Sequence, residues 1–349
     1  MSSADSGNSA GVSTALGLQP SGNLLESLVR RLDAFQQRHP ATAFAFGVVK
    51  KFGDDNAGVL VNNLAHAGFV SLFPLLLVLV TLASMFLGHH PGLRQELLHT
   101  AFAQIPIVGP DLAHNVHRLQ RSSPVALGIG MGTLLWGSFG LAQAGLFTMA
   151  QVWCLPGTKR PNYWVRLTRS LMFLAFLGVG LVVTTPVAGL GAIGHHAVAW
   201  RVGSLLLSTV LDAGMFLAVF RILTPAEVPS RRLWPGALVG GVAWSVLQVI
   251  GSVLIGRNLR IGSEVYGLFA IVLGVVAWVY LLSEITVYAA EVNVVLAHRL
   301  WPRSLVQPPL TPADRRALAM QATQNIRRPE EAVDVSFDDG DAGRSSLYD

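Results

Sequence analysis

The longest apolar stretch of the chain, residues 266–296, places the strongest constraint on its fold. As an α-helix rising about 1.5 Å per residue, it is long enough to cross a hydrocarbon core about 30 Å thick. It nevertheless contains two acids, Glu284 and Glu291, whose seven-residue spacing puts them on nearly one face with Tyr280 and Tyr288. Because an ionisable group in a membrane is costly, we expect this face to point away from lipid.

Apolar segments recur along the whole chain. Hydrophobic residues make up 52% of the 349 residues and charged residues only 13%, about half the charged share of a soluble domain. Further segments of membrane-spanning length lie at roughly 58–87, 125–151, 167–188 and 202–223, and another starts at residue 234. The sequence therefore predicts an all-α polytopic membrane protein with six transmembrane helices.

Basic residues indicate the orientation of these helices. Lys and Arg gather before the first segment, in the second and fourth connections, and after the last segment, whereas the opposite loops hold few. Since cytoplasmic loops carry the excess of Lys and Arg, both termini are expected in the cytoplasm. The net charge of +5 then reflects membrane orientation, and no nucleic-acid partner is expected.

The polar ends flank a membrane domain at residues 58–300. Residues 1–22 are rich in Ser, Gly and Ala and are expected to be a disordered tail. Residues 23–57 include an amphipathic segment that either lies on the inner membrane surface or packs on the protein's own cytoplasmic face. Residues 301–349 are expected to be a largely disordered cytoplasmic tail, interrupted by a short helix that starts at Thr311, with Pro312 in its first turn and Asp314 at its third position.

Polar residues and a proline mark the first and fourth segments. Asn62, Asn63 and His66 lie in the first half of the first segment. Pro74, in its middle, cannot donate a helical hydrogen bond, which predicts a helix kink or break. The three polar side chains either hydrogen-bond between helices or line a substrate path. Asp212, near the middle of the fourth segment, presents the same choice between a structural pair and a functional carboxylate.

Two GxxxG pairs predict close helix packing, Gly128 with Gly132 and Gly236 with Gly240. A nucleotide-binding loop at the first pair is not expected, because no strand precedes it and no Lys-Ser/Thr follows it. The sequence therefore predicts no cofactor.

Histidines concentrate in the two loops assigned to the outer side. They suggest either metal capture and pH sensing or ordinary polar surface; few acids and no cysteine lie near them, so no metal site is expected. The only cysteine, Cys154, excludes an intramolecular disulfide and a multi-cysteine zinc site. The histidines concerned are His89, His90, His99, His114, His117, His195 and His196.

Several motifs occur in a fixed order between residues 55 and 300. They are SLFPLLLVLV at 71–80, LLWG at 134–137, PGAL at 235–238, WVYL at 278–281 and AEVNVVL at 290–296. In order and spacing the chain resembles the YihY/BrkB family of bacterial inner-membrane proteins, formerly labelled ribonuclease BN. The resemblance implies six membrane helices with cytoplasmic termini. Glu291 and Asn293 belong to a shared motif and Glu284 does not, while His66, Ala67 and Ser245 depart from the family pattern.

The resemblance and the polar membrane residues together predict an inner-membrane transporter, or an exporter of a lipid or another envelope component, with membrane lipids as partners. The alternative is a non-transporting scaffold or accessory protein that binds a second copy or an envelope protein. Structural roles are alternatives for the acids, such as pairing of Glu291 with Arg299 or His298. The residues expected on the path are Asp212, Glu284, Glu291, Asn293, Asn62, Asn63 and His66.

An enzyme is not expected. A ribonuclease would need convergent carboxylates or histidines with a metal outside the bilayer, and the cytoplasmic segments offer neither an HxH nor a DxD cluster.

Overall fold

The computed structural model describes residues 22–86, 124–159, 162–173, 175–176, 198–224, 227–307 and 310–337, and these residues form helices and loops without a strand. The elements are α1 (Gly22–Arg38), α2 (Pro40–Asp54), α3 (Ala57–Phe86), α6 (Pro124–Val152), η2 (Gly157–Lys159), α8 (Val198–Leu223), η3 (Ser230–Arg232), α9 (Trp234–His298) and α10 (Pro312–Gln324). Three of the predicted membrane segments correspond closely to α3, α6 and α8. The third predicted segment lies mostly outside the described residues, of which 163–173 are helical.

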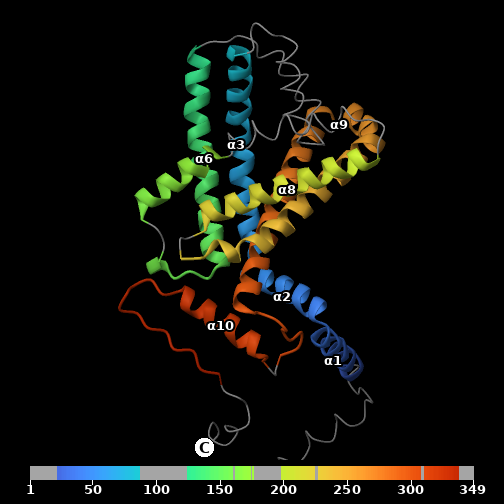
Figure 1. Ribbon diagram of the computed structural model, residues 1–349, viewed down its shortest axis with the longest axis vertical. Helices are drawn as coiled ribbons and strands as arrows, with labels where there is room; N and C mark the ends of the chain where they lie inside the picture. Colours follow the sequence, from blue (N-terminus) through green and yellow to red (C-terminus); the bar gives the residue numbers. More distant parts are fainter. Residues whose placement is uncertain are drawn as a thin grey trace, which may run out of the picture.

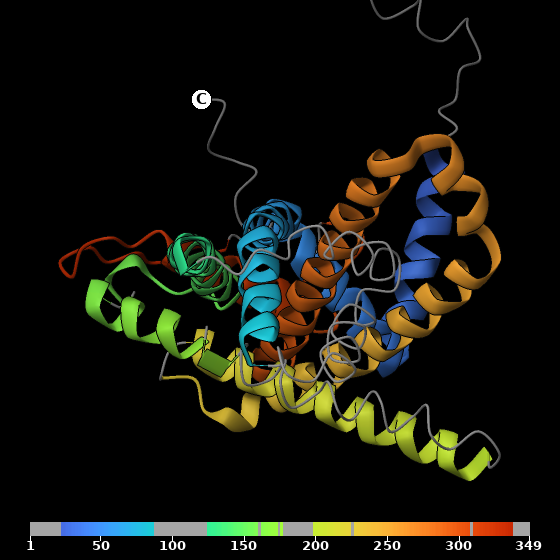
Figure 2. The same ribbon diagram turned by 90° about the horizontal axis from the view of Figure 1, so that it is seen from above.

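The helix α9 is 65 residues long and contains both of the last two predicted segments. A straight helix would separate residues 236 and 293 by about 85 Å. Instead, the backbone N–H of Gly236 donates to Oδ1 of Asn293 at 2.7 Å. The helix therefore folds back on itself, and its two arms are visible in Figures 1 and 2. The arms are joined by helical residues, whereas the sequence suggested two separate helices.

Three stretches of the described helices are long and apolar enough to cross a membrane. They are Leu205–Leu223 in α8 and the two arms of α9, Trp234–Gly251 and Val272–His298. The first arm lies along α8, while α3 runs beside α6 and contacts the second arm (Figure 1). The arrangement is that of an all-helical, multi-pass membrane protein.

Glycines permit the close contacts of α9. A Cβ at Gly236 would lie 2.0 Å from the carbonyl oxygen of Ala289, and one at Gly240 would lie 2.8 Å from Cδ1 of Phe216 in α8. Only a residue without a side chain fits at such an approach. By contrast, no described atom comes within 4 Å of a Cβ built at Gly128, and the same holds for its predicted partner Gly132, so close packing of that pair stays a prediction.

The first predicted helix, α3, is continuous through Pro74. The sequence allowed either a break or a kink at this proline. A break is therefore absent from the described helix, while a bend at Pro74 stays a prediction.

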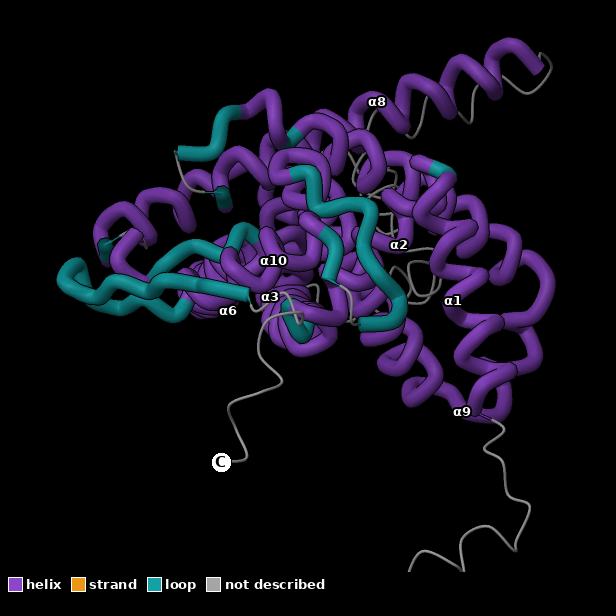
Figure 3. The backbone as a smooth tube through the Cα atoms, turned by 90° about the horizontal axis from the view of Figure 1, so that it is seen from below, coloured by secondary structure: helices purple, strands orange, loops and turns teal. Residues whose placement is uncertain are grey.

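The helices α1, α2 and α10 gather at one end of the molecule, where α10 lies near the ends of α3 and α6 (Figure 3). The predicted helix start is confirmed, because Thr311 and Asp314 form a reciprocal capping box at the start of α10. Within the tail that was predicted to be largely disordered, residues 301–307 and 310–326 are described by the structure. They contact the rest of the protein, as in the 2.8 Å hydrogen bond from Gly157 N–H to the Ile326 carbonyl. Disorder in the tail as a whole stays a prediction.

The amphipathic helix α1 packs on the protein itself at its C-terminal half. Asp33 is buried there and accepts hydrogen bonds from the Ser304 hydroxyl and the Leu305 N–H, both at 3.1 Å. These contacts show that this half of α1 packs on the protein itself, while the side of the membrane on which it lies stays a prediction.

Candidate functional site

The helix α2 carries a lysine into the protein interior. Ala43, Gly47 and Lys51 recur every four residues, so they share one helix face, and all three are buried. Gly47 allows this face to approach the end of α9, since a Cβ there would lie 3.0 Å from the carbonyl oxygen of Leu300. Lys51 continues the same buried stripe, and its ammonium therefore needs partners inside the protein.

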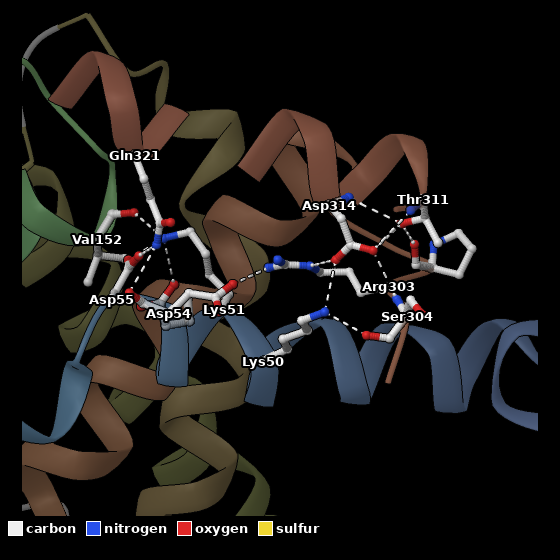
Figure 4. Close-up of polar contacts among 12 residues, drawn as sticks. Lys50, Lys51, Asp54, Asp55, Val152, Arg303, Ser304, Thr311, Asp314 and Gln321 are labelled. Atoms are coloured by element: carbon white, nitrogen blue, oxygen red, sulfur yellow. Dashed lines mark hydrogen bonds and ion pairs between the residues drawn. The ribbon is translucent and has the colours of Figure 1, made fainter. Parts of the chain in front are cut away.

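Those partners come from three elements. The Lys51 ammonium pairs with Asp55 at the end of α2 and donates to the Val152 carbonyl at the end of α6, at 3.2 Å. Its Nζ lies 3.6 Å from Oε2 of Glu291 on the second arm of α9, an ion-pair distance longer than a hydrogen bond. Lys51 and Glu291 are both completely buried. We call Lys51, Asp55, Glu291 and the Val152 carbonyl the Lys51 cluster. Figure 4 shows Lys51 with Asp55 and Val152.

Burial and nearby charges act together on Lys51 and on its neighbour Cys154. Burial alone would lower the pKa of Lys51, but Glu291 and Asp55 raise it above its ordinary value of 10.5, so the lysine stays charged. Burial raises the pKa of the Cys154 thiol to about 11, against the opposing effect of Lys51. Since the thiolate is the reactive form, burial makes Cys154 less reactive at neutral pH than an exposed cysteine.

A second group of contacts surrounds Asp314 in the first turn of α10. Its Oδ1 accepts from Lys50 Nζ at 3.0 Å and from Arg303 Nε at 2.9 Å, and its Oδ2 accepts from the Ser304 N–H at 3.1 Å. The Thr311 hydroxyl donates to the same oxygen. Burial alone would raise the pKa of Asp314, but these donors hold it well below its ordinary value of 3.8. We call Asp314 and these four donor residues the Asp314 latch.

One arginine joins the latch to the Lys51 cluster. Arg303 Nη1 lies 2.7 Å from Oδ2 of Asp54, the neighbour of Asp55. Gln321 of α10 adds a hydrogen bond of 3.0 Å to the Asp54 carbonyl. Figure 4 shows this continuous chain of contacts between α2, the α9 exit and α10. Each acid in this network has a cation beside it, so the network is suited to holding the helix ends together.

An open groove of about 740 Å³ borders this network. Carboxylates and amides dominate its wall, and the described residues contain no group of three or more His, Cys, Asp or Glu arranged to hold a metal. The groove follows the seam between α2, the end of α6 and α10. Its polar lining includes Asp54, Asp55, Gln151, Gln321, Gln324 and Arg327.

Asn293 has a structural position. Its side chain is buried, and it accepts the Gly236 N–H, one of the unpaired donors in the first turn of α9. The residue before that turn, Leu233, makes no side-chain cap. Asn293 thus caps the start of the helix from its distant end and holds the two arms together.

The other predicted path residues lie apart from the Lys51 cluster. Glu284 and Asp212 are half-buried within membrane-length stretches. Asp212 accepts a hydrogen bond of 3.2 Å from Ser245, which is itself 3.1 Å from the Thr209 hydroxyl. Of the path residues predicted on α3, all are exposed; they are Asn62, Asn63 and His66. The seven histidines of the outer loops lie outside the described residues.

Sequence reasoning missed Lys51, Arg303 and Asp314 as members of one network. It offered Arg299 or His298 as alternative partners of Glu291, which the structure places beside Lys51. The signal that could have found Lys51 is the four-residue repeat with Ala43 and Gly47. No local pattern identifies Arg303, since its partners come from other segments.

Comparisons with known proteins agree with this architecture. A family model described as Virulence factor BrkB matches residues 48–312. A UPF0761 membrane protein of Alteromonas mediterranea is 27% identical over 259 residues, which cover 70% of this chain and 85% of the relative. Its counterpart from Photobacterium profundum is 21% identical, covering 74% and 82%, and that from Saccharophagus degradans is 23% identical, covering 75% and 61%. No solved structure matches.

Proposed function

This chain belongs to the virulence factor BrkB family, and we propose that it is an inner-membrane transporter that exports a lipid or another component of the bacterial envelope. We propose further that it has six spans with both termini in the cytoplasm. The membrane-length arms of α9 and α8 support the spans. The Lys and Arg excess before the first span and after the last supports the orientation.

The proposal rests on two carboxylates in the spans, which are partly buried and have no ion pair among the described residues. Asp212 lies in the stretch Leu205–Leu223, and Glu284 lies in Val272–His298. Both are half-buried, and no Lys, Arg or His of the described residues forms an ion pair with either. Glu291, on the same arm as Glu284, has Lys51 beside it.

Magnitudes favour a use for these two acids. A charged side chain at the centre of a membrane helix costs about 2.5–3.5 kcal/mol on insertion scales. A hydrogen bond between membrane helices, such as that from Ser245 to Asp212, returns on average about 0.6 kcal/mol. The hydrogen bond is much too weak to offset the cost of the charge, so a structural role does not account for either carboxylate. Each is suited to binding a proton, a cation or a cationic headgroup on a transport path.

The test uses the full chain in proteoliposomes of phosphatidylethanolamine and phosphatidylglycerol that contain a fluorescent headgroup-labelled phospholipid. Dithionite added outside destroys only outer-leaflet fluorescence, so further loss reports translocation. We expect translocation with the wild type, and its loss in the Asp212→Asn and Glu284→Gln variants. Glu330→Gln, an exposed acid outside the spans, is the matched control and should behave as wild type.

Unchanged translocation in both variants would remove these carboxylates from the path. If the wild type moves no labelled lipid and crosslinking recovers a stoichiometric envelope partner, the scaffold alternative replaces the transporter.

A further inference from the structure

Five arginines lie at or near the connection between α8 and α9. Two lie three residues apart on the helical residues 163–173 and therefore share a face. One lies in the last turn of α8, and two form the end of η3. We call this set the arginine rim; it consists of Arg166, Arg169, Arg221, Arg231 and Arg232.

Neutral contacts hold three of these guanidiniums in place. Arg166 Nε donates to Oε1 of Gln143 on α6 at 2.7 Å, and Gln143 in turn donates to the Ser170 hydroxyl at 3.1 Å. Arg169 Nη1 donates to the Thr224 carbonyl at 3.2 Å, and Arg221 Nη1 reaches a carbonyl of the loop that follows. The side chains are thus positioned by groups that leave their positive charge uncompensated.

The rim differs in this respect from the interior of the same protein. Buried Arg303 lies between two carboxylates, those of Asp54 and Asp314. None of the rim arginines has a carboxylate of the described residues within 4 Å. Arg169 and Arg221 are close enough to repel each other, and the exposed Glu227 is the acid that acts on Arg169. Since each guanidinium has five N–H donors, most remain available to an anion.

Aromatic side chains place the rim at the membrane surface. Trp164 and Tyr163, beside Arg166, are 71% and 61% exposed, and Trp234 at the start of α9 is 56% exposed. Trp and Tyr collect at the level of lipid headgroups, where an apolar ring and a polar edge are both satisfied. An anion that meets the arginine rim at this level is therefore one attached to a lipid.

We infer that the arginine rim is a binding site for the phosphate of an anionic phospholipid headgroup, with Arg169 and Arg221 as its centre and the neighbouring aromatic rings against the acyl chains. Arginine suits this partner because its planar fork matches phosphate oxygens. The site does not depend on transport, and it would bind lipid even if the protein moved none.

The test is native mass spectrometry of the full chain in detergent. The protein is titrated either with phosphatidylglycerol, which is anionic, or with phosphatidylcholine, which is zwitterionic and has no net charge. The wild type should bind phosphatidylglycerol more tightly. Basic residues near a membrane surface attract anionic lipids electrostatically. Removing two of them in the double variant Arg169→Gln, Arg221→Gln should therefore weaken phosphatidylglycerol binding about 30-fold. Phosphatidylcholine binding should stay within about twofold of wild type.

Matched variants separate the site from general charge and from folding. Arg38→Gln with Arg328→Gln removes the same charge from exposed positions elsewhere and should leave binding unchanged. Arg169→Lys with Arg221→Lys keeps the charge and should give an intermediate affinity. Wild-type affinity for phosphatidylglycerol in the double Gln variant would overturn the site. Displacement of the lipid by an equal concentration of soluble glycerol 3-phosphate would overturn its assignment to a lipid.

Discussion

Two acids on one arm of α9 illustrate two ways in which this protein uses charge. Glu291 is completely buried beside Lys51, within a network that extends through Asp54 and Arg303 to α10. Glu284, two helical turns earlier, is half-buried and has no ion pair among the described residues. Glu291 has a lysine of the same protein beside it. Glu284 has no such partner among the described residues, so it is available to a ligand from outside the protein. The residue type alone therefore does not distinguish a structural carboxylate from a candidate transport residue.

The largest effect is expected from Lys51→Met, which keeps the apolar stem and removes the ammonium. Glu291 and Asp55 would then remain without their cation, and breaking a buried pair in this way costs about 3–5 kcal/mol. Thermal unfolding can be followed with a thiol-reactive dye, because Cys154 is the only cysteine and is buried. The double variant Lys51→Met with Glu291→Gln should regain part of the loss. A single variant as stable as wild type would show that the Lys51 cluster does not hold the helices together.

The next effect concerns the fold-back of α9. Gly236→Ala would place a methyl group 2.0 Å from the Ala289 carbonyl oxygen, so the two arms must separate, at a cost of about 1–3 kcal/mol or more. Gly128→Ala is the matched control: no described atom opposes its methyl group, and Ala favours a helix over Gly by up to about 1 kcal/mol. The same unfolding measurement should rank Gly128→Ala at or above wild type. The opposite order would contradict the close approach of the arms.

Asp314 should make the stability of the folded protein depend on pH. Its pKa is lower in the folded protein than its ordinary value of 3.8, so the unfolded chain takes up the proton first as the pH falls. The stabilisation is complete above that value and is lost as the pH falls through the folded pKa. Tryptophan fluorescence during denaturation between pH 7 and pH 3 should show a steeper loss for wild type than for Asp314→Asn. At pH 7 the variant should be less stable by about 1–3 kcal/mol. Parallel pH profiles would remove Asp314 from the latch.

The smallest effect on stability is expected from Glu284→Gln. No described ion pair is lost, so any loss of stability should stay below about 0.5 kcal/mol. Glu291→Gln, which removes a partner of Lys51, should cost more, about 1–3 kcal/mol. Equal losses in the two variants would end the distinction between the fixed and the available acid.

Much of the fold follows from local sequence. The apolar segments predicted at 58–87, 125–151 and 202–223 correspond to α3, α6 and α8 because the length and polarity of a membrane helix are properties of consecutive residues. The start of α10 was equally accessible, since Thr311 and Asp314 satisfy each other's backbone within one turn. The connection between the last two spans was not predictable in this way. Residues 251–272 continue the helix where a loop was expected.

The candidate site was accessible only in part. The sequence identified Glu291 and Asn293 as members of one motif, but their partners Lys51 and Gly236 lie far away along the chain. By itself, the sequence determined an all-helical membrane protein and the positions of its acids, because hydrophobic length, helix capping and side-chain type are local. The tertiary structure decided which acid is neutralised, since ion pairing and steric approach depend on distances that only the packing of α2, α9 and α10 sets.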